Sequence, residues 1–207
     1  YVAGNTISDA IHKTKKLNSQ GYEVTIDLLG EHIKELDEIN NITNIYIELL
    51  EQIYSKNLLS NISVKPSHIG LDIGIDTFKK NAVKLVEKSQ KLNNFIRFDM
   101  ESSAATDATI ETFKEIYKEH KNIGTVFQAY LKRTYSDLEN LMNQQINFRL
   151  CKGIYNEDAR IAYKDYNEIN ENYLKIAELA FKNDSYIGLA THDLNLTKRL
   201  YDLIDNY

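Results

Sequence analysis

The feature that most constrains this chain is a regular alternation between short apolar runs and longer segments with helical spacing. Six runs rich in β-branched and aliphatic residues are interpreted as strands: 22–29, 61–68, 95–100, 124–131, 147–152 and 186–191. Between them, apolar residues recur every three or four positions, which predicts amphipathic helices. Strands that alternate with helices pair in parallel, so the sequence predicts an α/β fold.

Two parallel architectures are candidates, an open doubly wound sheet and a (β/α)8 barrel. A dinucleotide-binding open sheet normally carries G-x-G-x-x-G after its first strand, whereas residues 27–31 here are D-L-L-G-E. All six runs end in polar side chains, which a barrel would gather around one mouth. We therefore predict a TIM-barrel-type fold that is incomplete, with about six β/α units. Residues 1–207 form a single barrel domain in this interpretation, without the last strand and helix units.

Local patterns predict two helix starts and the positions of the histidines. A helix is expected over about 6–17, before the first strand, and Ser136 with Glu139 has capping-box spacing, which predicts a helix start at Ser136. The histidines other than His192, among them His68, are expected on helix or loop surfaces.

Charge and cysteine content exclude several classes of protein. Lys and Arg number 25 and Asp and Glu number 30, and the basic residues are scattered, so we expect no nucleic-acid partner. The single cysteine, Cys151, has no Cys/His cluster beside it, so we expect no metal site and a reducing, cytoplasmic compartment. No apolar stretch approaches the ~18 residues that cross a bilayer.

Five motifs fall at the ends of successive runs: S-V-K-P-S at 63–67, R-F-D-M-E at 97–101, F-Q-A-Y-L at 127–131, R-L-C-K-G-I-Y at 149–155 and A-T-H-D at 190–193. In order and spacing they resemble the flavin-dependent proline dehydrogenases of the bacterial single-function type. The resemblance implies a barrel that binds FAD without a covalent bond and oxidises L-proline to 1-pyrroline-5-carboxylate, the first step of proline catabolism. It also implies a quinone as electron acceptor, peripheral contact with the inner face of the membrane, and 1-pyrroline-5-carboxylate dehydrogenase as the downstream enzyme.

The resemblance assigns roles to individual residues. Asp99 and Arg149 are the expected catalytic residues, with Arg149 near the flavin N5 and Asp99 ionised and organising the pocket. Lys65 is expected to meet the proline carboxylate, and Tyr155 to face the substrate. The expected cofactor-binding residues are Met100, Gln128, Arg149, Lys152, Gly153, Ile154, Thr191 and His192.

The chain departs from the family pattern at three places. Ile154 replaces a common alanine, and Asp193 replaces the asparagine of A-T-H-N, so we expect this carboxylate to point away from the cofactor pyrophosphate. The sequence ends at Tyr207, before the pair of adjacent arginines that clamps the substrate carboxylate in the family. Two alternatives therefore stay open: a Schiff-base aldolase that uses Lys65 or Lys152, and a catalytically incompetent fragment of the barrel.

Overall fold

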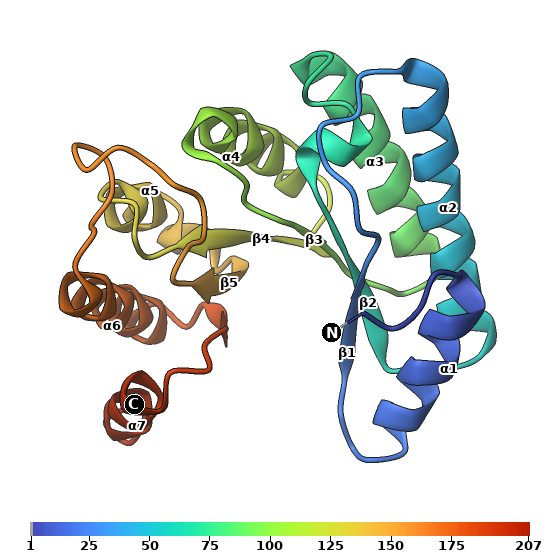
Figure 1. The fold of residues 1–207 in the computed structure, drawn as a ribbon. Coiled ribbons are helices and arrows are strands. Elements are labelled where there is room, and N and C mark those ends of the chain that lie inside the picture. Colours follow the sequence, from blue (N-terminus) through green and yellow to red (C-terminus); the bar gives the residue numbers. More distant parts are fainter. Residues whose placement is uncertain (1) are drawn as a thin grey trace. The chain divides into compact units, whose positions relative to one another are not determined.

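The computed structural model describes residues 2–207 and confirms the predicted alternation of strands and helices (Figure 1). The strands are β1 (Val24–Asp27), β2 (Ser60–Val64), β3 (Ile96–Phe98), β4 (Ile123–Gln128), β5 (Asn147–Cys151) and β6 (Tyr186–Leu189). The α-helices are α1 (Ile7–Asn18), α2 (Leu36–Ser55), α3 (Ile75–Lys91), α4 (Ser103–Tyr117), α5 (Thr134–Glu139), α6 (Tyr166–Lys182) and α7 (Leu194–Ile204). Two 3-10 helices, η1 (Pro66–Ile69) and η2 (Met142–Gln144), lie between them.

These elements belong to two compact units. The first holds the chain up to Asp99 together with Asp107–Ile123, and the second holds Met100–Thr106 and Gly124–Tyr207. In the first unit β1 pairs with β2 and β2 with β3, and in the second β4 pairs with β5 and β5 with β6, all in parallel. Within each unit the strand order in the sheet follows the order in the chain, as expected when each helix returns the chain to the next strand.

The core of the first unit lies between its strands and helices α2 and α3, which run side by side in Figure 1. The inward face of α2 repeats at helical spacing and buries Ile39, Tyr46 and Leu50 completely. Phe78 of α3 meets Phe98 of β3 edge to face, with ring centroids 5.7 Å apart. Burial of these large apolar side chains is the main force that holds the helices on the sheet.

The second unit packs its helices α5, α6 and α7 in chain order, as Figure 1 shows. Phe127 of β4 and Phe148 of β5 contact edge to face at 5.7 Å, and both are fully or nearly fully buried. The buried face of α6 includes Tyr173 and Ile176, and the Tyr173 hydroxyl donates to the Leu150 carbonyl at 2.8 Å. This bond ties the helix to strand β5.

The structure corrects two local expectations. The strand expected over 61–68 stops at Val64, because Pro66 cannot donate to a sheet and instead opens η1. Helix α5 begins at Thr134 and not at Ser136, whose hydroxyl donates to the Arg133 carbonyl. The capping box of the chain lies instead at Thr6, whose side chain accepts from the Asp9 backbone while the Asp9 carboxylate accepts from the Thr6 backbone. No helix within residues 2–207 is long and apolar enough to cross a membrane.

Candidate active site

Lys65 lies directly after β2, at the centre of a cluster of carboxylates in the first unit. Its ammonium is 3.1 Å from Oδ2 of Asp27 and 3.7 Å from Oε1 of Glu31. Burial opposes the positive charge, but attraction to Asp27, Asp99 and Glu31 outweighs it and raises the pKa of the Lys65 ammonium. The cluster therefore holds a charged lysine at the strand ends.

Asp99 follows β3, and its charge is one of those that raise the pKa of the Lys65 ammonium. Its backbone N–H donates to the Val64 carbonyl at 2.9 Å, which extends the parallel ladder past the end of β3. The hydroxyl of Ser63 donates to its carboxylate at 2.6 Å. This hydrogen bond fixes the position of the Asp99 side chain at the end of β3.

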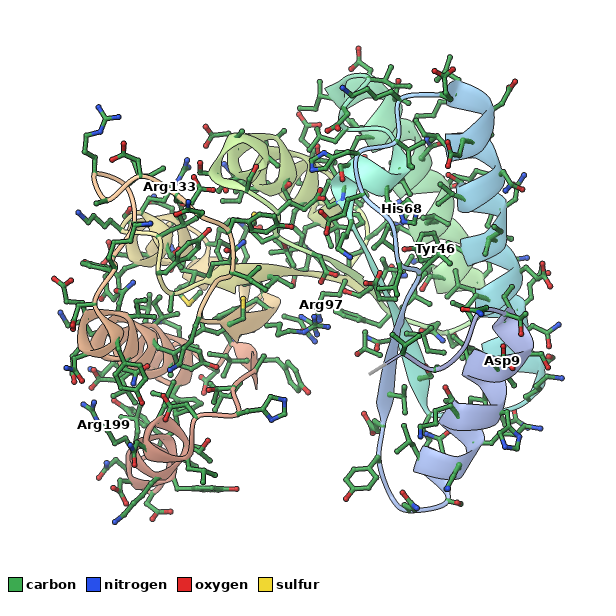
Figure 2. The ribbon with its side chains drawn as sticks, in the orientation of Figure 1. Asp9, Tyr46, His68, Arg97, Arg133 and Arg199 are labelled. Carbon is green, nitrogen blue, oxygen red and sulfur yellow. The ribbon has the colours of Figure 1, made fainter. Side chains whose placement is uncertain are left out.

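Two buried aromatic residues of the first unit, Tyr46 and His68, lie near each other (Figure 2). Their rings meet edge to face at 6.2 Å, and the Tyr46 hydroxyl lies 3.5 Å from Oδ1 of Asp27. Burial, followed by the charge of Asp27, raises the pKa of Tyr46 well above its usual range, so the hydroxyl stays neutral. The expected surface position of His68 is wrong: the residue is only 3% exposed, because Gly30 has no side chain to clash with its ring.

Gln128 ends β4 and is almost fully buried in the second unit. Its amide nitrogen donates to the carbonyls of Met100 and Glu101 at 2.9 and 2.8 Å. These two bonds fix the segment after β3 and orient the amide. The Oε1 oxygen consequently points elsewhere, and it has no hydrogen-bond partner in the part of the chain that the structure describes.

Arg149 lies in β5, where its register partners are Val126 on one side and Gly188 on the other. Gly188 leaves room beside the arginine, since a Cβ there would only touch its aliphatic stem at 3.8–3.9 Å. Sequence alternation places Arg149 and Cys151 on one face of the strand, and the Cys151 thiol donates to the Phe127 carbonyl at 3.6 Å.

The loop after β5 carries four of the predicted site residues, and the three that follow Lys152 lie in different surroundings. Gly153 adopts a φ of +109°, and any Cβ there would overlap the ring of Tyr130. Ile154 is 89% exposed. Tyr155 is partly buried and packs against the cluster of Tyr130, Leu131 and Ala162, so part of its surface is used for packing.

The turn after β6 holds Thr191, which is partly buried, and His192, which is exposed. The Thr191 hydroxyl oxygen accepts from the backbone of Asp193 at 3.1 Å. Asp193 caps helix α7 and pairs with Lys152 at 2.5 Å. Lys152 is thus joined to the turn that the sequence assigned to the same site.

Sequence reasoning missed several residues that organise these strand ends. Glu157 accepts from both the backbone N–H and the hydroxyl of Ser103, at 2.6 Å each, and so anchors the loop after β5 to the start of α4. Tyr166 and Asn170 both donate to Asp193. Their partners lie tens of residues away in the chain, so no local pattern indicates these contacts. Residues 2–207 contain no group of three or more His, Cys, Asp or Glu side chains suited to a metal ion.

Parallel strands that end in charged and amide side chains, within β/α units, define an α/β enzyme of the TIM-barrel type. The family model described as "Proline dehydrogenase" matches residues 10–207. The chain belongs to the proline dehydrogenase family, oxidoreductases that act on proline. This confirms the family that the five motifs indicate.

Individual relatives agree with this assignment. Proline dehydrogenase 2 of Bacillus subtilis (strain 168) is 33% identical over 202 residues, covering 96% of this chain and 67% of its own length. Proline dehydrogenase of Deinococcus radiodurans is 32% identical over 198 residues, with 93% and 64% covered. The chain thus spans about two thirds of the length of the relatives it matches.

Solved structures confirm the fold class. Proline utilization A (PutA) from Bdellovibrio bacteriovorus, inactivated by N-propargylglycine, superposes with a TM-score of 0.90 at 22% identity, over 100% of this chain and 26% of that one. PutA from Bradyrhizobium japonicum gives a TM-score of 0.82 at 18% identity, over 100% and 25%. At these identities the likeness concerns the fold, which is the predicted α/β barrel type.

Proposed function

We propose that this chain oxidises L-proline to 1-pyrroline-5-carboxylate by hydride transfer to noncovalently bound FAD. The family supports proline as the substrate. The observation that carries the cofactor assignment is the buried Oε1 oxygen of Gln128, which finds no partner among residues 2–207. Buried polar atoms are normally hydrogen-bonded, and the pyrimidine N–H of a flavin is a donor that would satisfy this acceptor.

In the proposed reaction a hydride leaves C5 of proline, a proton leaves its nitrogen, and a C=N double bond forms between the two atoms. Bound FAD supplies the two-electron acceptor for this step. Arg149 provides a positive charge held by its strand, and such a charge stabilises the negative charge that arrives with the hydride. Met100, Gly153, Ile154, Thr191 and His192 are proposed to surround the cofactor. Lys152, which the resemblance also assigns to the cofactor, is held instead in its ion pair with Asp193.

Lys65 is proposed to bind the proline carboxylate. Asp27 and Glu31 hold its ammonium in place and keep it charged before substrate arrives. Asp99 is proposed to organise the pocket as an ionised group fixed by Ser63, and Tyr155 to face the substrate with the part of its ring that does not pack.

The proposed reaction leaves the flavin reduced, so an electron acceptor must reoxidise it before the next turnover. We further propose that this acceptor is a quinone. The product is an imine acid, which requires a dehydrogenase acting on 1-pyrroline-5-carboxylate as the next enzyme. A cytoplasmic location with peripheral contact at the membrane fits such an acceptor.

The charges around the lysines support this proposal over a Schiff-base aldolase. An amine nucleophile needs a lowered pKa so that its neutral form is populated. The carboxylates around Lys65 instead raise its pKa, and Lys152 is paired with Asp193. Neither lysine is prepared for attack on a carbonyl group.

Two measurements test the proposed function. The purified chain titrated with FAD should show a bound-flavin absorbance spectrum, and L-proline should bleach it and drive reduction of an electron-accepting dye. D-proline serves as the control substrate. A chain that binds no flavin and reduces no dye would instead support the incompetent fragment, and borohydride trapping of a carbonyl substrate on Lys65 would support the aldolase.

A further inference from the structure

The carboxylate of Asp193 carries an unusual number of hydrogen bonds for one side chain. Its Oδ1 oxygen caps helix α7 by accepting from the backbone of Asn195 and Leu196 at 3.0 and 3.1 Å. Its Oδ2 oxygen accepts from Lys152 and the Tyr166 hydroxyl at 2.5 Å each. The Asn170 amide adds a third, longer bond of 3.3 Å to Oδ2.

These bonds connect three elements that meet at the strand ends of the second unit. Lys152 follows β5, Tyr166 begins α6, and Asp193 precedes α7. The Lys152 ammonium also lies 4.4 Å from the centroid of the Tyr166 ring, a cation–π distance. The Lys152 and Asp193 side chains are 26% and 13% exposed, so water only partly screens their charges.

The hydrogen bond from Lys152, followed by that from Tyr166, holds the pKa of the Asp193 carboxyl well below its usual range. The Asp193 carboxylate is therefore ionised at neutral pH, and its negative charge offsets that of the Lys152 ammonium.

We propose that Asp193 is a positioning residue that neutralises Lys152 and fixes it to α7, so that this lysine does not act as a counter-charge for the phosphates of FAD. The inference rests on the proposed function, because it concerns how the chain meets that cofactor. Lys152 and Asp193 together present no net charge to an anionic ligand. Lys152 alone would present a positive charge, and Asp193 alone would present a negative charge.

The substitution Asp193→Asn separates the two roles of this carboxylate. The amide oxygen can still cap α7, since asparagine is as good an N-cap as aspartate. The amide nitrogen, however, faces the N–H donors of Lys152 and cannot hold them. We expect the released ammonium to tighten FAD binding about tenfold, the size of one charge-assisted hydrogen bond, and we expect salt to reduce this gain.

Four proteins give a distinct order of affinities: the unchanged chain, Asp193→Asn, Lys152→Met and the double variant. Titration of flavin fluorescence should find Asp193→Asn tightest and Lys152→Met weakest, because the latter leaves Asp193 uncompensated. The unchanged chain and the double variant should lie close together between them. Riboflavin lacks the phosphates, so its affinity should follow no such order.

Asp165→Asn is the matched control. Asp165 caps α6 in the same way, by accepting from the backbone of Asn167 and Glu168 at 2.9 and 3.1 Å, and it forms no ion pair with any residue in 2–207. This variant should leave FAD affinity within twofold of the unchanged chain. An equal gain in Asp165→Asn would show a general charge effect and overturn the proposal.

Two further outcomes would overturn it. If Lys152→Met and the double variant lose FAD equally, then Lys152 binds the cofactor directly whatever stands at position 193. The second outcome concerns the protein without flavin. In urea unfolding, the losses in free energy of unfolding caused by Asp193→Asn and by Lys152→Met should not add up to the loss in the double variant. Additive losses would mean that the ion pair does not form. This last measurement stands even if no variant binds FAD, a result that would refute the proposed function instead.

Discussion

The substitution Gln128→Leu tests whether the buried amide at the end of β4 holds the segment after β3. Leucine keeps much of the volume and apolar contact of glutamine but donates no hydrogen bond. The carbonyls of Met100 and Glu101 would both lose their donor, in surroundings where these residues are only 7% and 2% exposed. Water therefore cannot readily replace the amide.

The expected cost follows from these contacts. Each unsatisfied buried carbonyl costs about 1–3 kcal/mol, whereas removal of the unpartnered Oε1 relieves part of the desolvation cost of the amide. We expect a net loss of about 3 kcal/mol in the free energy of unfolding. For a chain of this size that corresponds to a melting temperature about 6–12 °C lower.

Thermal unfolding followed by circular dichroism measures this change. Gln20→Leu, in the exposed turn after α1, is the control for replacing a glutamine by a leucine. The melting temperature of the control should move by less than about 2 °C, since surface substitutions change stability little. Addition of FAD should stabilise the unchanged chain more than Gln128→Leu, which lacks the acceptor. A Gln128→Leu protein as stable as the unchanged chain would refute the role of the two amide bonds.

Four other predictions follow from single contacts. Gly153→Ala should lower the free energy of unfolding measured in urea by at least about 1 kcal/mol, because φ is +109° and a Cβ overlaps Tyr130. Burial, followed by the charge of Lys65, lowers the pKa of His68. The contribution of the neutral imidazole to the free energy of unfolding is therefore fully present above pH ~6.5 and should fall as the pH drops below that value. The same pH scan of the His68→Gln protein should lack this fall. Lys65→Met should raise the KM for proline more than it lowers kcat, in steady-state dye reduction. Arg149→Lys should slow flavin reduction at saturating proline in stopped-flow measurements, and an unchanged rate would remove Arg149 from the mechanism.

The order of elements was predictable because it depends on local patterns. β-branched runs and helical spacing indicate strands and helices without knowledge of the partner, and all six strands were found. The carboxyl ends of the strands were less predictable. Lys65 and Thr191 lie inside the runs interpreted as strands, but both belong to loops, because the chain leaves the sheet where the polar site residues begin.

The contacts among the site residues were mostly not predictable. Lys152 meets Asp193 across 41 positions of sequence, and Ser63 meets Asp99 across 36. The burial of His68 depends on Gly30, a residue on another strand's loop. Motif resemblance placed these residues near strand ends, but the direction of each hydrogen bond requires the fold.

The division of the chain has a consequence for any attempt to express it in two pieces. Met100–Thr106 belongs to the second unit although its neighbours on both sides in the sequence belong to the first. A cut between Ile123 and Gly124 would leave this segment on the amino-terminal fragment, whereas Gln128 and Glu157, which bind its backbone, would be on the other. The amino-terminal fragment would hold all of the first unit, but the carboxy-terminal fragment would lack Met100–Thr106 of its own unit. Complementation of the two fragments would therefore require this short segment of the first to restore its hydrogen bonds with the second.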